Sequence, residues 1–137
     1  MSDKTSVIRG PKDVSVKTRN VLRTMLTGTK IMTLPKGARI LYFVVSGVAS
    51  DAGTTAIISL GNTVAATEYI PTYDVKTVAT GRGPGIPGTN NASFSSVLTV
   101  DTPIFALYAE TGTASSGGAW KVSCVYTTGN AINDDTI

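Results

Sequence analysis

The sequence predicts an all-β protein folded as a two-sheet antiparallel sandwich. Its 137 residues are rich in Gly, Thr, Ser, Ala and Val, only 15% are charged, and no long amphipathic helix can be written from them. About six to eight short apolar or alternating runs recur at roughly ten-residue spacing, with turn residues between them. We therefore expect one domain with an extended N-terminal arm, wired as a jelly-roll.

Composition divides the chain into three parts. These are a basic N-terminal arm and edge segment (1–29), a β-sandwich domain (30–128) and a polar tail (129–137). Gly10-Pro11 interrupts the polar start of the chain, so the arm should be extended. Val14 and Val16 open one or two edge strands, although Thr18 to Leu26 also holds enough helix formers for a single helical turn.

The stretch from Ala38 to Val48 is the most apolar and most β-prone part of the chain. A short strand from Lys30 to Leu34 and a Pro35-Lys36-Gly37 turn lead into it. Its apolar run from Ile40 to Val45 is unbroken, which predicts a central strand with protein on both faces. Thr54 to Leu60 follows a turn and is expected to pair antiparallel with this strand as a hairpin.

The middle of the chain alternates between strands and turns. Thr67 to Val75 contains Pro71, which predicts an edge strand or an ordered loop. Thr80 to Asn91 is so dense in glycine and proline that we expect a loop outside any sheet. Ser93 to Val100 is a second candidate strand, and Thr102 to Glu110 is a clear strand with both faces covered.

The last strand has the cleanest period of two. Thr111 to Gly118 is expected to be a flexible hairpin tip, and Trp120 to Thr127 follows it. Alternation places one set of side chains inside and the other in solvent. The inward set is Trp120, Val122, Cys124 and Tyr126, and the outward set is Lys121, Ser123 and Thr127.

Charge is distributed unevenly along the chain. Nine basic and two acidic residues up to Arg39 give a net charge of +7, whereas three basic and seven acidic residues from Ile40 onward give −4. Such asymmetry indicates a basic arm that docks on an acidic surface, whether nucleic acid or protein. The alternative is that the basic side chains of the arm are solvated and have no binding role. Nucleic acid is disfavoured because no aromatic residues are interleaved with the cations.

Catalytic and metal-binding groups are sparse. The chain has no histidine, which removes the commonest general base and metal ligand, and its single Cys124 falls on an inward face, where a thiol is inert. Two carboxylate pairs, Glu68 with Asp74 and Asp101 with Glu110, have the residue types for acid–base catalysis, but solvated loop positions explain them better. We expect no enzyme, no cofactor and no metal site.

Two tyrosines on the proline-containing edge segment are candidates for an interface. Tyr69 and Tyr73 flank Pro71 and are expected to be exposed, where aromatic side chains concentrate binding energy. With Trp120 they are also the candidates for a glycan-binding platform, although Trp120 fits the core pattern. Arg82, between two glycines of the expected loop, is a possible partner contact, and the loop lacks the Lys-Ser/Thr of a nucleotide-binding loop.

Three segments carry a family resemblance. They are Thr33-Leu34-Pro35-Lys36-Gly37-Ala38-Arg39-Ile40, Asp101-Thr102-Pro103-Ile104-Phe105-Ala106-Leu107-Tyr108 and, after a Gly/Ser turn, Trp120-Lys121-Val122-Ser123-Cys124-Val125-Tyr126. This pattern resembles the small β-sandwich virion proteins of tailed bacteriophages, which include capsid decoration (cement) proteins and head-fibre or tail-associated relatives. The resemblance implies a non-enzymatic structural protein that binds the major capsid protein or another virion protein, often as a homotrimer.

The expected function is therefore stabilisation of a bacteriophage capsid, with a glycan-binding module on a head fibre or tail as the alternative. The expected location is the virion, after synthesis in the host cytoplasm, with neither membrane nor nucleic acid as partner. The cations expected to steer and anchor the protein are Arg9, Lys12, Lys17, Arg19 and Arg23. Tyr69, Tyr73 and Arg82 are expected on the partner or subunit surface.

Overall fold

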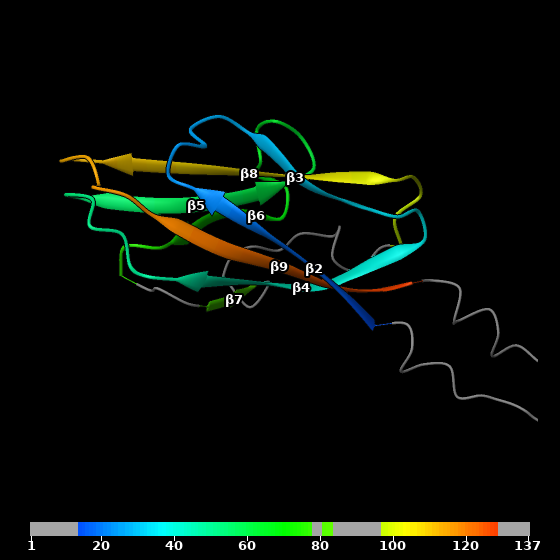
Figure 1. Cartoon of the computed structure of the whole chain (residues 1–137). Helices are drawn as coiled ribbons and strands as arrows, with labels where there is room; N and C mark the ends of the chain where they lie inside the picture. The colour runs from blue at the N-terminus through cyan, green and yellow to red at the C-terminus, as the bar shows by residue number, and fades with distance from the viewer. Residues whose placement is uncertain (1–13, 78–80, 84–96, 129–137) are drawn as a thin grey trace, which may run out of the picture.

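The computed structural model describes residues 14–77, 81–83 and 97–128 (Figure 1). Within these ranges all regular structure is β-strand, and every strand pairs antiparallel with its neighbours. The strands are β2 (Val14–Leu22), β3 (Thr29–Leu34), β4 (Ala38–Gly47), β5 (Thr55–Gly61), β6 (Ile70–Asp74), β7 (Gly81–Gly83), β8 (Thr102–Thr111) and β9 (Ala119–Thr128). The predicted all-β class is confirmed.

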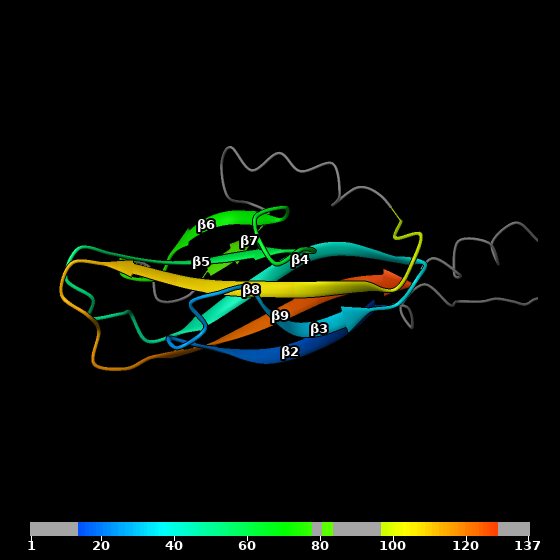
Figure 2. The same cartoon turned by 90° about the horizontal axis from the view of Figure 1, so that it is seen from above.

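The strands form two four-stranded sheets, ordered β2-β9-β4-β7 and β3-β8-β5-β6. Figure 1 shows them as two layers, and Figure 2 shows the strands of one sheet running over those of the other. Successive strands mostly change sheets, and the first and last described strands lie side by side. This interleaved order is that of a jelly-roll, in which two Greek keys close on each other.

The core lies between the sheets and follows the predicted alternation. Trp120, Val122 and Cys124 of β9 are buried, and Trp120 stacks on Tyr108 of β8 with ring centroids 4.9 Å apart. Offset aromatic stacking adds to the stability gained from burying two large rings. The inward and outward sets predicted for the last strand are confirmed.

β4 is central in its sheet, between β9 and β7, as predicted. The expectation that protein covers both its faces is wrong, because Leu41 is 38% exposed and Tyr42 and Val44 are only half-buried. In a two-layer sandwich each sheet has one inner face, so an unbroken apolar run does not require a second cover. The expectation of two covered faces is wrong for β8 as well, since Phe105 and its outward neighbours are half-buried.

The predicted hairpin between β4 and β5 is wrong. β5 lies in the opposite sheet, where it pairs with β8 and β6. Residues 48–54 therefore cross from one sheet to the other, and Ser50 N–H donates to the carbonyl of Val75 on the way (2.8 Å). Residues 112–118 make a second crossing, between β8 and β9, so the expected hairpin tip is also wrong.

The glycine-rich loop is shorter than predicted, because Gly81–Gly83 pairs with Phe43 to Val45 as the edge strand β7. β7 lies at the edge of its sheet and pairs with β4 alone, and glycine in a strand is commonest where another backbone approaches closely. The rest of that loop, from residue 84, and the start of the Ser93 to Val100 strand lie outside the described residues, while residues 97–100 are not in a strand. The predicted edge strand around Pro71 is confirmed as β6.

The edge segment predicted at Val14 is confirmed as β2, which pairs with β9 through nine consecutive residues. The alternative of a helical turn within Thr18 to Leu26 is not observed; a tight turn follows Leu22 instead. Val14 lies opposite Thr127, so the start of β2 and the end of β9 lie at the same end of the sheet (Figure 1).

Candidate functional site

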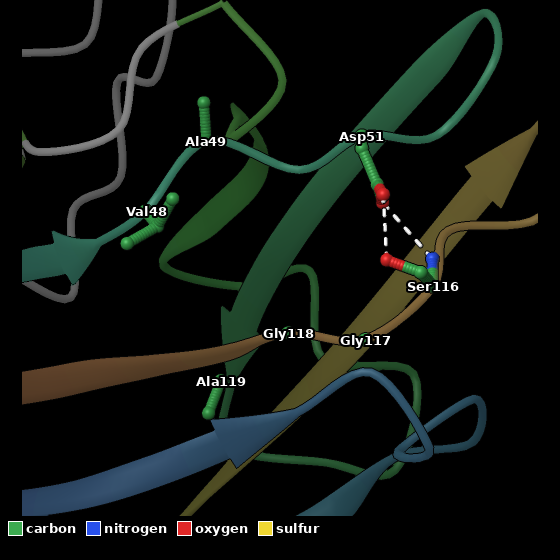
Figure 3. A pocket seen from close by; sticks show the side chains of 7 residues that line it. All are labelled: Val48, Ala49, Asp51, Ser116, Gly117, Gly118 and Ala119. Atoms are coloured by element: carbon green, nitrogen blue, oxygen red, sulfur yellow. Dashed lines mark hydrogen bonds between the residues drawn. The ribbon is translucent and has the colours of Figure 1, made fainter.

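A pocket of about 420 Å³ lies where the β4–β5 and β8–β9 crossings meet. Figure 3 shows residues of the first crossing facing residues of the second across it. Its lining consists of Val48, Ala49, Asp51, Ser116, Gly117, Gly118 and Ala119. Small side chains and glycine backbone thus form most of the wall, and Asp51 is the charged residue among them.

Asp51 holds the two crossings together. Its Oδ1 accepts a hydrogen bond from Ser116 N–H (3.0 Å) and its Oδ2 accepts one from Ser116 Oγ (2.6 Å), as Figure 3 shows. These bonds stabilise the carboxylate and lower the pKa of Asp51 below its ordinary value. The acid in the pocket is therefore already occupied by protein donors.

Glu110 of β8 is the centre of a second polar network, which includes Ser115 of the β8–β9 crossing. Its Oε1 accepts from Tyr108 Oη (2.7 Å) and Ser115 Oγ (2.6 Å), and its Oε2 accepts from Ser115 N–H (3.1 Å). Arg23 Nε donates to Ser115 Oγ (2.8 Å), and Arg23 Nη2 lies 3.5 Å from Glu110 Oε2. Because the Tyr108 proton is given to Glu110, Ser50 Oγ must be the donor in its 2.9 Å bond to Tyr108 Oη.

This network holds the chain in place and has no group ready for acid–base chemistry. Hydrogen bonds from Ser115 and Tyr108 lower the pKa of Glu110, so this carboxylate stays ionised. Burial raises the pKa of Tyr108 above its ordinary value, so this phenol stays protonated. In the described ranges, no three His, Cys, Asp or Glu residues gather closely enough to hold a metal ion.

The other predicted carboxylates stabilise turns. Glu68 accepts from Asn62 N–H (2.9 Å) and Thr63 Oγ1, Asp74 accepts from the N–H groups of Lys76 and Thr77, and Asp101 accepts from Lys36 N–H (2.9 Å). Burial acts to raise the pKa of Glu68, but the bonds from Thr63 and Asn62 outweigh it and keep the pKa below its ordinary value. The pairs Glu68–Asp74 and Asp101–Glu110 are thus four separate structural groups.

Cys124 is fully buried, as predicted. Burial raises the pKa of its thiol to about 12, so the reactive thiolate is not formed at neutral pH.

The predicted anchoring cations have different environments. Lys17 Nζ donates to the carbonyl of Thr33 in the opposite sheet (2.6 Å), and Arg23 belongs to the Glu110 network, so both contribute to the fold. Arg19 is exposed on β2. Arg9 and Lys12 lie outside the described residues.

The predicted exposure of Tyr69 and Tyr73 is wrong. Tyr69 has no exposed surface and packs against Phe43, with ring centroids 5.8 Å apart, and Tyr73 is also buried. β6 is an edge strand but still has an inner face, and the register shift against β5 between Ile58 and Leu60 lets both Ile70 and Tyr73 lie in the core. With Trp120 buried as well, none of the three aromatics proposed for a glycan platform is at the surface. Arg82 lies in β7, at the register position opposite Val44.

Charge is segregated between the sheets, which the linear pattern did not reveal. The four strands β2, β9, β4 and β7 contain no acidic residue; their five basic residues are Lys17, Arg19, Arg39, Arg82 and Lys121. The described carboxylates lie instead in β6, in β8 or in connections. The two-ended charge of the sequence thus becomes one strongly basic sheet.

Comparisons with known proteins reveal a shared fold. No protein-family model and no curated protein sequence matches the chain. A chain of the cyanophage Pam1 capsid asymmetric unit has a TM-score of 0.65 at 19% identity, covering 84% of this chain and 84% of that chain. A chain of the acidic stable capsid structure of Helicobacter pylori bacteriophage KHP30 has a TM-score of 0.61 at 11% identity, covering 85% of this chain and 89% of that chain. The chain therefore shares its fold with a chain of each of these two bacteriophage capsid structures.

Proposed function

We propose that this protein is a structural component of a bacteriophage virion that binds the assembled capsid and stabilises it as a decoration protein. The observation that carries the proposal is the fold similarity to chains of two phage capsid structures. Because each comparison covers similar shares of both chains, those chains are close to this one in length. The similarity thus spans most of each chain.

The site chemistry supports a structural role. The carboxylates of Asp51 and Glu110 are engaged by donors of the same chain, and the polar network ties β8 to the connection after β2. Such contacts make a rigid body, which loses little conformational entropy on binding. A rigid protein that binds only the assembled shell stabilises it by mass action, and repetition on a symmetric lattice adds avidity.

The partner in this proposal is the major capsid protein or another virion protein, bound through the basic side of the molecule. Arg9 and Lys12 of the arm and the exposed Arg19 of β2 are the proposed steering cations. Lys17 and Arg23 drop out of that set because they are bonded within the fold. The trimeric state implied by the family resemblance is part of the proposal.

Cosedimentation with empty capsids tests the proposal. The full-length protein should sediment with capsids of the phage that encodes it, in many copies per shell, and more weakly at high salt, which screens exposed charges. An Arg9→Gln/Lys12→Gln variant leaves the described sandwich intact and should bind more weakly at low salt. Absence of binding at both salt concentrations, together with absence of the protein from purified virions, contradicts the proposal.

A further inference from the structure

The outer face of the β2-β9-β4-β7 sheet can be identified from two contacts. Lys17 reaches Thr33 of the opposite sheet, so the odd-numbered positions of β2 lie on its inner side, where Arg19 is nevertheless exposed because β2 is an edge strand. Thr18 Oγ1 and Ser123 Oγ lie 2.8 Å apart on the other side of the same strands. Val14 and Val16, which alternate with Lys17 as Thr18 does, therefore lie on the outer face.

This outer face carries an apolar stripe. Val14 is 50% exposed and Val16 is 58% exposed, although both are β-branched aliphatic residues. Val16 lies opposite Val125 of β9, which is only 8% exposed, and Val125 lies opposite the half-buried Tyr42 of β4, so apolar residues follow one another across three strands of this face. Exposed apolar side chains gathered on one face are typical of interaction sites.

A β-bulge widens the stripe. The register of β4 against β9 shifts between Ile40, which is buried, and Tyr42. The extra residue is Leu41, which the shift leaves 38% exposed beside Tyr42. Two consecutive large side chains thus point away from the core. β-Bulges commonly redirect side chains in this way.

Cations surround the stripe. Arg39 and Lys121 alternate with the buried residues Ile40 and Val122 and so lie on the same outer face. The buried Nε of Arg39 has no hydrogen-bond partner among the described residues. The four strands contribute no carboxylate to pair with these cations.

We propose that this outer face is the surface that docks on the capsid, and that its partner is an apolar protein patch rimmed by Asp and Glu side chains. The side chains that it presents are Val14, Val16, Leu41, Tyr42, Arg39 and Lys121. The inference rests on the proposed function and specifies the partner chemistry. Aliphatic residues at the centre suit protein better than nucleic acid, whose bases need stacking partners. A second copy docked face to face would place like charges opposite each other.

Two matched valine substitutions test the position of the surface. Val16→Asp puts a carboxylate in the stripe, and Val64→Asp makes the same change at an equally exposed valine (58% against 60%) in the β5–β6 connection. Both variants should fold, because both sites are exposed. We expect Val16→Asp to weaken binding to empty capsids of the encoding phage by about tenfold or more, which corresponds to roughly 1.4 kcal/mol, and Val64→Asp to bind as wild type.

Two matched lysine substitutions test the charge of the partner. Lys121→Glu reverses a cation on the proposed surface, and Lys30→Glu reverses an exposed cation of β3 in the opposite sheet. Both change the net charge equally. Only Lys121→Glu should weaken capsid binding, with a reduced salt dependence.

The outcomes separate the inference from the proposed function. Suppose that wild type binds capsids, that Val16→Asp binds as well as Val64→Asp, and that Lys121→Glu binds as well as Lys30→Glu. The inference is then overturned, while the proposed function stands. If wild type binds no capsids, both fail. If Val16→Asp dissociates an oligomer of the free protein, or if Lys121→Glu alone abolishes binding to single-stranded DNA of mixed sequence, the face belongs to a second copy or to nucleic acid and the inference is overturned.

Discussion

Arg23 and Glu110 form an ion pair, with Nη2 and Oε2 3.5 Å apart, that links the connection after β2 to β8. Ser115 bridges the same two side chains by accepting from Arg23 Nε and donating to Glu110 Oε1. A cation that the linear charge pattern assigns to a partner is therefore part of the fold. The partner-facing charge of this protein must be sought on the outer face of the β2-β9-β4-β7 sheet instead.

The Glu110 network makes stability dependent on pH. Because the folded-state pKa of Glu110 is lowered from 4.5, its contribution is present above about pH 4.5 and is lost as the pH falls through the folded-state value. We expect Glu110→Gln to have a lower Tm than wild type at pH 7, and the difference to shrink below about pH 4. Thermal unfolding followed by circular dichroism at pH 7 and at pH values below 4 checks this. A constant Tm difference at every pH would contradict a role for the ionised carboxylate.

Two neighbouring isoleucines of β5 should differ sharply in their contribution to stability. Ile58 is fully buried between the sheets, and Ile57 is half-buried on the outer face. Ile58→Ala should lower the free energy of unfolding by about 2–5 kcal/mol, since it removes buried surface and leaves a cavity. Ile57→Ala serves as the control and should cost clearly less. Urea unfolding of both variants measures the difference, and equal losses would show that the strand is not oriented as described.

Gly112 is required by backbone conformation and by close packing. Its φ is +84°, and a Cβ there would lie 2.7 Å from Thr54 N. Gly112→Ala should therefore destabilise the fold, by about 1–3 kcal/mol from the backbone conformation alone. Gly117→Ala, in the same crossing, meets no atom within 4 Å and should have little effect. Differential scanning calorimetry measures the stability of both variants. A Gly112→Ala variant as stable as wild type would contradict this prediction.

Cys124 should be protected from alkylation in the native state. Its thiol is fully buried and its pKa is raised to about 12, so almost no thiolate forms at pH 8. Native protein should react with iodoacetamide many times more slowly than protein unfolded in urea. Mass spectrometry of timed samples measures both rates. Rapid native labelling would mean that β9 is accessible, contrary to its central place in the sheet.

The local sequence pattern was sufficient to predict most strand positions and the buried face of β9. Alternation along Trp120 to Tyr126 predicts the buried face of β9, because successive side chains of any strand point to opposite sides. Proline in the segment around Pro71 predicts an edge position, because its nitrogen cannot donate to a neighbour. These are properties of a few adjacent residues, so the sequence alone determined the all-β class, most strand positions and the inertness of Cys124.

Tertiary structure decided what each strand faces. Thr54 to Leu60 reads as the partner of β4 by proximity, yet it pairs with β8, about fifty residues away, because the jelly-roll sends successive strands to opposite sheets. The same wiring buries Tyr69, joins Arg23 to Glu110 and leaves Val16 exposed. Burial and pairing depend on residues distant in the chain, so the surface that meets a partner emerges only when the two sheets are assembled.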